Sequence, residues 1–290
     1  MSWALVADSS CNLRAYQPVS PDAVFRIAPL KISVAGREFV DDEHLDAGSM
    51  NKAMELADAA SSSSCPSVGE WAEHFRCAQN VIAITISSQL SGSYEAALMA
   101  RNLVMEEYML EHGGVIGGKN IHVLDSRAAG GKLELMVELL DRYIAAHEPS
   151  FDEAVAYLER LERRSTVLFS LCSYGNLVKG GRMPKLAGAV ATKLSIRMLG
   201  MASEVGTIKV VGSTRSEKRM VQRVCDAMAE HGFHGGLVYI DHVENSEGAA
   251  KLAKAIRGRW QGSTVRIQEC GGLCSYYAEA AGLIVGFEWA

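Results

Sequence analysis

The sequence lacks several features that would place it in a specialised class of protein. It contains no apolar run approaching the roughly 20 residues that a membrane-spanning helix needs, so we expect no stable membrane anchoring. It also has no basic excess, because 29 lysines and arginines are mixed with 34 aspartates and glutamates, giving a net charge of −5. Nucleic-acid-binding surfaces usually show a basic stripe, so we expect no nucleic-acid partner.

A disulfide framework and a secretion signal are missing as well. The seven cysteines are an odd number, and only Cys270 and Cys274 lie close together, in CGGLC. Two thiolates with no second pair and no nearby histidine make a poor zinc site, so we expect no metal and no other cofactor. The start, MSWALVADSS, turns polar sooner than a secretory signal with its apolar stretch of roughly 7–15 residues. We therefore expect a cytoplasmic protein in a reducing compartment.

What the sequence does contain is an alternation of short apolar runs with amphipathic stretches. Two of the amphipathic stretches begin with a Ser-x-x-Glu capping box, at Ser67 and at Ser150. Such alternation favours right-handed βαβ units. We predict an α/β fold whose N-terminal part is a Rossmann-like, mainly parallel sheet with helices on both faces. The predicted strands are 3–7, 24–34, 80–86 and 120–125, and the predicted helices are 68–79, 94–109, 131–146 and 151–164.

The pattern changes after about residue 165. Two strands joined by a tight turn at Gly206 indicate a hairpin, which parallel βαβ units do not contain. We therefore predict a second, C-terminal α+β domain, which places the two domains at 1–165 and 166–290. Separately, we expect the chain to be a monomer. Its predicted strands are 166–173, 196–204, 207–213, 236–243, 264–270 and 283–289, with helices at 216–231 and 246–258.

Small polar residues follow three of the predicted N-terminal strands, as Asp8-Ser9-Ser10, Ser87-Ser88 and Asp125-Ser126. Ligands of open parallel sheets collect at the carboxyl ends of the strands. Two serine-rich segments accompany them: 61–67, predicted to be a loop, and 87–97, which runs from a strand into a helix. Hydroxyls and free N–H groups at a helix N-terminus suit a carboxylate or a phosphate. The same serines can equally cap helices and turns.

Several of these segments together resemble a known family. VADSS, APLKISVAGREFVDDE, SSCPS, ISSQLSGSYEAA, VLDS and NLVKGGRMPK occur in this order. They resemble the successive signatures of DegV proteins, across residues 4–215, and NLVKGGR and SSQLSGSY are the more specific of them.

The resemblance implies a lipid-binding, non-catalytic protein with a Rossmann-like N-terminal domain and a C-terminal α/β domain. A single long-chain fatty acid would lie in an apolar tunnel, with its carboxylate near the domain junction. Some such proteins present the acyl chain to a fatty acid kinase, which would then be a partner. Carried over by position, the ligand-binding residues are Ser63 and Ser64 of the loop, Ser91 and Ser93 of the turn, the charge partner Arg182, and Tyr276.

The C-terminal segment departs from the family pattern. Tyr276 stands where the family commonly has a histidine, and Ala278-Glu279-Ala280 replaces a Gly-Pro-Gly turn. A phenol donates a hydrogen bond but carries no positive charge at neutral pH. Glu279 would repel a carboxylate unless its side chain points away.

Two alternatives remain open, and a third is disfavoured. A serine hydrolase, or another enzyme for a small acyl or phosphate ligand, would use Ser91, although QLSGS lacks the first glycine of G-x-S-x-G. An interaction protein would keep its ligand only as a folding cofactor. A P-loop at 113–120 is disfavoured because GGVIGGKN lacks the following Ser or Thr and precedes a strand.

Overall fold

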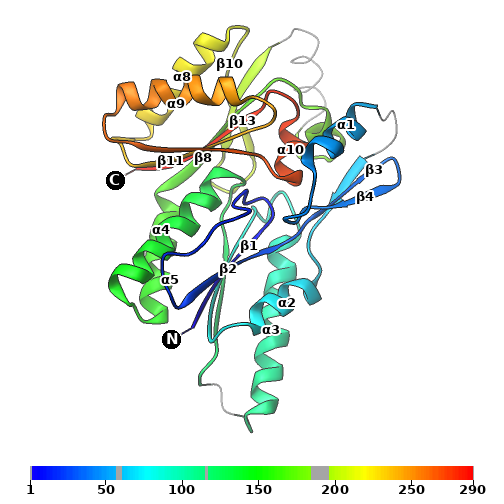
Figure 1. Cartoon of the computed structure of the whole chain (residues 1–290), viewed down its shortest axis with the longest axis vertical. Helices are drawn as coiled ribbons and strands as arrows, with labels where there is room; N and C mark the ends of the chain where they lie inside the picture. The colour runs from blue at the N-terminus through cyan, green and yellow to red at the C-terminus, as the bar shows by residue number, and fades with distance from the viewer. Residues whose placement is uncertain (1, 57–60, 115–116, 184–195, 290) are drawn as a thin grey trace.

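The computed structural model of the chain describes residues 2–56, 61–114, 117–183 and 196–289. Two large sheets lie one above the other, and a small third sheet lies to one side (Figure 1). In spatial order the N-terminal sheet is β2 (Ala23–Ala28), β1 (Trp3–Asp8), β6 (Asn80–Thr85) and β7 (Asn120–Asp125). The C-terminal sheet is β10 (Ile208–Thr214), β9 (Arg197–Ala202), β8 (Ser165–Leu171), β13 (Leu283–Glu288), β11 (Leu237–His242) and β12 (Thr264–Glu269). The small sheet is β4 (Arg37–Val40), β3 (Lys31–Val34) and β5 (Ser61–Ser64).

The helices of the described residues fall into three groups. Those beside the N-terminal sheet are α2 (Val68–Arg76), α3 (Ser93–Glu111), α4 (Gly131–His147) and α5 (Phe151–Arg163). Those on the C-terminal sheet are α8 (Glu217–Glu230) and α9 (Ser246–Arg259). Short helices α1 (Ala47–Leu56), α6 (Gly175–Lys179) and α10 (Gly272–Ala278) lie towards the small sheet. No helix in these described ranges is long and apolar enough to cross a membrane.

The N-terminal sheet is parallel throughout and has helices on both faces, as predicted. Alternate residues of β1 pack on opposite sides. Val6 joins a cluster with Trp71 of α2 and Ala97 of α3, whereas Leu5 joins one with Leu140 of α4. Both predicted capping boxes are present, at the starts of α2 and α5.

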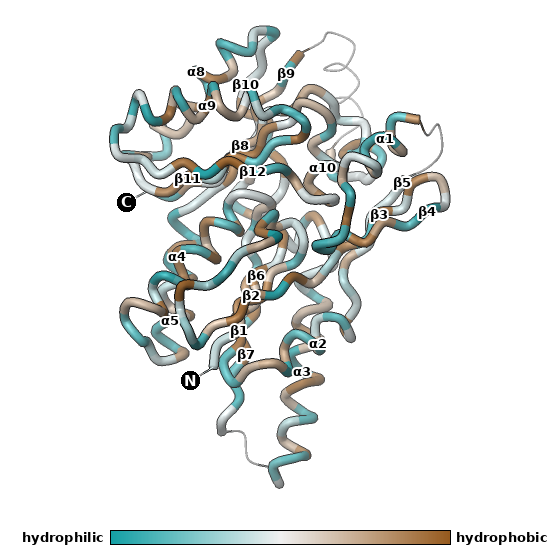
Figure 2. Tube along the Cα trace, in the orientation of Figure 1, coloured by the Kyte–Doolittle hydropathy of each residue, from teal (hydrophilic) through white to brown (hydrophobic). Residues whose placement is uncertain are grey.

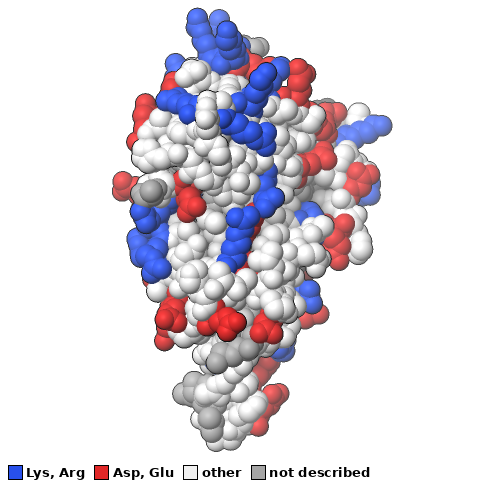
Figure 3. All heavy atoms as spheres, turned by 60° about the vertical axis from the view of Figure 1, so that its left-hand side comes forward, with Lys and Arg blue, Asp and Glu red and all other residues white. Residues whose placement is uncertain are grey.

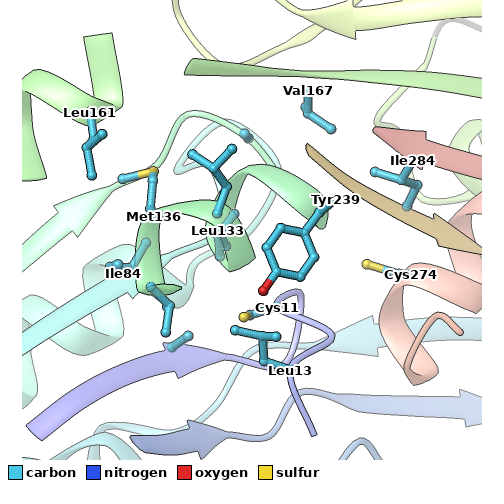
Figure 4. Packing of buried hydrophobic residues seen from close by; sticks show 14 of the residues in the cluster. Cys11, Leu13, Ile84, Leu133, Met136, Leu161, Val167, Tyr239, Cys274 and Ile284 are labelled. Carbon is cyan, nitrogen blue, oxygen red and sulfur yellow. The ribbon is translucent and has the colours of Figure 1, made fainter. Parts of the chain in front are cut away.

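The C-terminal sheet is mixed, and its predicted hairpin is the antiparallel pair β9–β10. Helices α8 and α9 cover one face (Figure 1), while α4 packs against β11 and β13 on the other. Helix α4 therefore lies between the two large sheets. One hydrophobic cluster spans both sheets, and it includes Ile84 of β6, Met136 of α4 and Val167 of β8 (Figure 4).

Hydropathy follows this layering. Hydrophobic residues are concentrated along the inner strands in Figure 2, and hydrophilic residues on the outer turns of the helices. Acidic and basic side chains are interspersed over the face shown in Figure 3. The division at 165/166, at the start of β8, stays a prediction.

Two local predictions were wrong. Residues 24–34 are not one strand, because they form β2 and β3, which belong to different sheets. Pro29 lies between them, and without an N–H it does not continue a hydrogen-bonded ladder. Residues 61–64 are not loop, because they pair with β3 as strand β5. Serine has little intrinsic strand preference, so the pairing with β3 decides this conformation. The segment 113–120 leads from α3 into β7, although residues 115–116 lie outside the described residues.

Candidate functional site

An apolar pocket lies between the two large sheets. Its walls come from the segments after β6 and β7, from four strands of the C-terminal sheet, and from α6 and α10. Most of the lining side chains are aliphatic or small. The lining residues are Ile86, Leu90, Ala128, Ala129, Val167, Phe169, Leu171, Leu177, Arg182, Ala202, Gly206, Thr207, Ile208, Leu273, Cys274, Tyr277, Ala278 and Ile284. A mostly apolar lining with one charged side chain is typical of a site for a small apolar ligand.

Arg182 gives the cavity a polar end, and it is the one charged side chain among the described lining residues. Its Nε donates to the Leu90 carbonyl oxygen at 2.9 Å, and a terminal nitrogen donates to the Gly180 carbonyl oxygen at 2.8 Å. Its guanidinium carbon lies 5.4 Å from the ring centre of Tyr277, within cation–π range. These contacts hold a positive charge where the apolar wall ends.

Two further segments meet at this end. The Tyr277 hydroxyl lies 2.8 Å from Ser63 Oγ, which joins α10 to β5. A Cβ built on Gly92 would lie 3.5 Å from Cys65 Sγ, so the chain after β5 lies against the turn before α3. Ser91 is in that turn, half-buried, and its Oγ accepts from Ser93 N at 3.3 Å. The structure thus brings Ser63, Ser91 and Arg182 to one region, and of the three only Arg182 lines the cavity itself.

The other predicted site residues lie elsewhere. Ser93 is fully buried, and its Oγ donates to Asp8 Oδ2 at 2.6 Å. Ser64 is exposed, on the face of β5 opposite to Ser63, because side chains alternate along a strand. Neither side chain lines the cavity.

Tyr276 does not line the cavity either. Its ring is fully buried in a cluster with Ile32, Phe39 and Met50, and its hydroxyl donates to Ser61 Oγ at 2.9 Å. Burial raises the pKa of this phenol, so it stays neutral. The position predicted from sequence thus supports the small sheet and is not part of the cavity wall.

Tyr277 is the lining residue that sequence reasoning missed. Leu273, Cys274, Tyr277 and Ala278 all line the cavity. Their spacing of i, i+1, i+4 and i+5 is one face of a helix, which excludes residue 276. Recognising 272–278 as a helix would have placed Tyr277, and not Tyr276, on the face that lines the cavity.

The polar residues at the strand ends mostly hold the fold together. Asp8 is fully buried and accepts hydrogen bonds from Ile86 N, Ser10 N and two serine hydroxyls. Burial raises the pKa of this carboxyl, and the hydrogen bonds oppose the rise. Ser87 Oγ donates to the Gly206 carbonyl oxygen at 2.8 Å, which joins the end of β6 to the β9–β10 turn.

Glu279 points away from the apolar cavity. Its carboxylate accepts from Asn176 N at 2.9 Å and from the Ser173 hydroxyl. It lines a separate, polar pocket together with Lys179 and Glu244. The expected repulsion of a carboxylate ligand therefore does not apply to this arrangement.

A hydrolase would need a base within hydrogen-bond reach of Ser91. Among the described residues no histidine hydrogen-bonds to this serine, and its Oγ accepts from a backbone amide instead. The described residues also contain no group of three or more His, Cys, Asp or Glu side chains that could hold a metal ion.

Comparisons with known proteins give one consistent result. The model of a family described as "Uncharacterised protein, DegV family" matches residues 2–287. A DegV domain-containing protein of Streptococcus pneumoniae is 36% identical over 288 residues, which is 99% of each chain.

Two solved structures are similar over their whole length. One is the Streptococcus pneumoniae fatty acid kinase (Fak) B3 protein loaded with linoleic acid, with a TM-score of 0.94, 36% identity and 100% of each chain covered. The other is a DegV family protein of Eubacterium eligens loaded with heptadecanoic acid, with a TM-score of 0.91, 31% identity and the same coverage.

Proposed function

Because the chain belongs to the DegV family, we propose that it binds a single long-chain fatty acid in the apolar cavity. The observation that carries this proposal is a pocket lined mostly by apolar side chains, with one arginine at its end. A fatty acid has the same division between a long apolar chain and one anionic group. The fatty acids in the two similar solved structures support the same ligand class.

The carboxylate would lie at the Arg182 end, near the junction of the two sheets. Arg182 supplies charge and planar donors suited to a carboxylate. We propose Ser63 and Ser91 as hydroxyl donors, with Tyr277 in the role that the sequence pattern had assigned to Tyr276. Ser64 and Ser93 would support the site from outside, since one faces solvent and the other binds Asp8.

The acyl chain would supply most of the binding free energy. Each methylene removed from water contributes about 0.8 kcal/mol. Burial of about ten methylenes gives roughly 8 kcal/mol before the entropy cost of binding, which is enough for tight binding of one ligand. The contacts to the head group then orient the ligand and select for an acid.

We further propose that the protein is a carrier and not a catalyst, and that it presents the bound acid to a fatty acid kinase in the cytoplasm. The name of the similar pneumococcal protein, a fatty acid kinase B3 protein, supports such a partnership. All seven cysteines are free, as suits a reducing compartment. No cofactor is needed for this role, and a monomer would suffice for it.

Denaturing extraction followed by mass spectrometry, with native mass spectrometry alongside, tests the proposal. We expect one fatty acid per chain after purification. A protein that is empty, and that also fails to take up added fatty acid, would rule out the carrier role.

A further inference from the structure

Phe169 is the bulkiest side chain on the sheet wall of the cavity. Val167, Phe169 and Leu171 of β8 all line the cavity, as expected for alternate residues of one strand. Other lining residues, among them Ala128, Ala129 and Ala278, are small.

The position of the Phe169 ring depends on a glycine. Phe169 and Gly200 lie directly opposite each other in the antiparallel pair of β8 and β9. Ala202 lines the cavity two residues further along β9, so Gly200 belongs to the same face of the sheet. A Cβ built on Gly200 would overlap the Cε2 and Cζ atoms of the Phe169 ring. The ring therefore lies over the glycine backbone, in space that any other residue would fill.

From this packing we propose that Phe169, seated over Gly200, determines the length and shape of the acyl chain that the cavity accepts. The inference rests on the proposed function and adds the residue pair that gives it specificity. With glycine at position 200, the ring stays against the sheet and leaves the cavity open. A methyl group at position 200 would force the ring off the sheet, towards the cavity that Phe169 lines.

Three variants test the pair. In Gly200→Ala the displaced ring shortens the space, so affinity for sixteen- and eighteen-carbon acids should fall by about fourfold for each methylene excluded. A ten-carbon acid should lose less affinity, because it has fewer methylenes that the smaller space can exclude. In Phe169→Leu the space grows, so the affinity for longer or cis-unsaturated acids should increase relative to the affinity for short ones. In the double variant the smaller leucine fits over the alanine, so long-chain affinity should return towards that of the parent.

The measurement is a titration of delipidated full-length protein with saturated acids of ten to eighteen carbons and one cis-unsaturated acid. Gly212→Ala is the matched control, because it adds the same methyl group to the same sheet, and the one atom that its Cβ would approach closely belongs to the flexible end of Arg223. This control should keep the parent profile. Thermal unfolding identifies any variant that fails to fold, and Phe169→Leu alone still tests the proposal.

The outcomes separate this inference from the function on which it rests. A changed ranking of chain lengths in the two single variants, with recovery in the double variant, supports it. If the folded variants still bind fatty acids and rank the chain lengths as the parent does, Phe169 does not have the proposed role. The carrier function is then left intact. A parent protein that binds none of the acids overturns both.

Discussion

The hydroxyl of Tyr277 lies 2.8 Å from Ser63 Oγ, although the two residues are 214 positions apart in the chain. One belongs to the helix that precedes the last strand, and the other to the edge of the small sheet. Arg182 lies over the same tyrosine ring and reaches the turn that holds Ser91. The groups proposed for the carboxylate thus come from separate segments, and only the complete fold brings them together.

Tyr277→Phe should weaken fatty acid binding, because it removes one hydrogen bond at the head group. A neutral hydrogen bond is worth about 1 kcal/mol, so the Kd should rise about fivefold. Tyr276→Phe is the matched control: it loses the bond to Ser61, lowers the free energy of unfolding, and leaves the Kd unchanged. Equal effects of the two variants on the Kd in a lipid titration would contradict the assignment.

Arg182→Gln should weaken binding of fatty acids much more than binding of the matching fatty alcohols. Hydrogen bonds to a charged group contribute roughly 1.5–3 kcal/mol, which predicts a rise in Kd of about ten- to a hundredfold for the acid. The alcohol keeps the acyl contacts and lacks the charge, so it reports whether the cavity is intact. Lys179→Gln, an exposed change in the neighbouring polar pocket, should affect neither ligand. Equal losses of affinity for the acid and the alcohol would mean that Arg182 does not bind the head group.

Ser91→Ala and Ser93→Ala should change different properties of the protein: the first its affinity for fatty acid, and the second its stability. Ser91→Ala should raise the Kd for fatty acid with little change in stability. Ser93→Ala removes a hydroxyl donor from the buried Asp8 carboxylate, so it should lower the free energy of unfolding by about 1–3 kcal/mol. Urea unfolding and a lipid titration of both variants decide this. A Ser91→Ala protein with parent affinity would exclude that serine from the site.

Asp241→Asn should flatten the pH dependence of stability. Asp241 and Glu134 form a fully buried carboxyl pair between β11 and α4, and burial raises the pKa of Asp241 from 3.8 to about 6. A carboxyl whose pKa is higher in the folded state stabilises the fold at low pH, and this stabilisation is lost as the pH rises through the folded pKa. At about 1.4 kcal/mol per pH unit, the parent should lose up to about 3 kcal/mol between pH 4 and 7 from this group.

The asparagine does not ionise, so the variant should show a smaller loss, which comes from Glu134 alone. Urea unfolding at several pH values measures it, and the exposed Asp226→Asn serves as the control. Parallel stability curves for the parent and Asp241→Asn would mean that the pair does not retain a proton in this range.

The elements that could be predicted from sequence are those with local causes. The capping boxes at Ser67 and Ser150 and the apolar run of β1 act over a few residues, and the structure has all three. Strand β5 escaped prediction because four serines become a strand only through pairing with β3, about thirty residues earlier. No local pattern carries that information.

The site was predicted in part, for a similar reason. The motifs identified Ser63, Ser91 and Arg182, which the fold does bring to one region. They gave no indication that Ser93 turns inward to Asp8, because that contact joins residues 85 positions apart. They also pointed to Tyr276 and not to Tyr277. Which of these two tyrosines lines the cavity depends on how the seven-residue helix α10 is rotated about its axis.

Helix α4 belongs in sequence to the first half of the chain, yet it packs against strands of both large sheets. Cutting the gene after residue 165 would therefore leave the first product with an uncovered helix face and the second with an uncovered sheet. We expect neither half to be a soluble protein when it is produced alone, although the two together could reassemble. Exchange of the bound lipid must then proceed by local opening around the cavity, since the halves do not separate without loss of their shared interior.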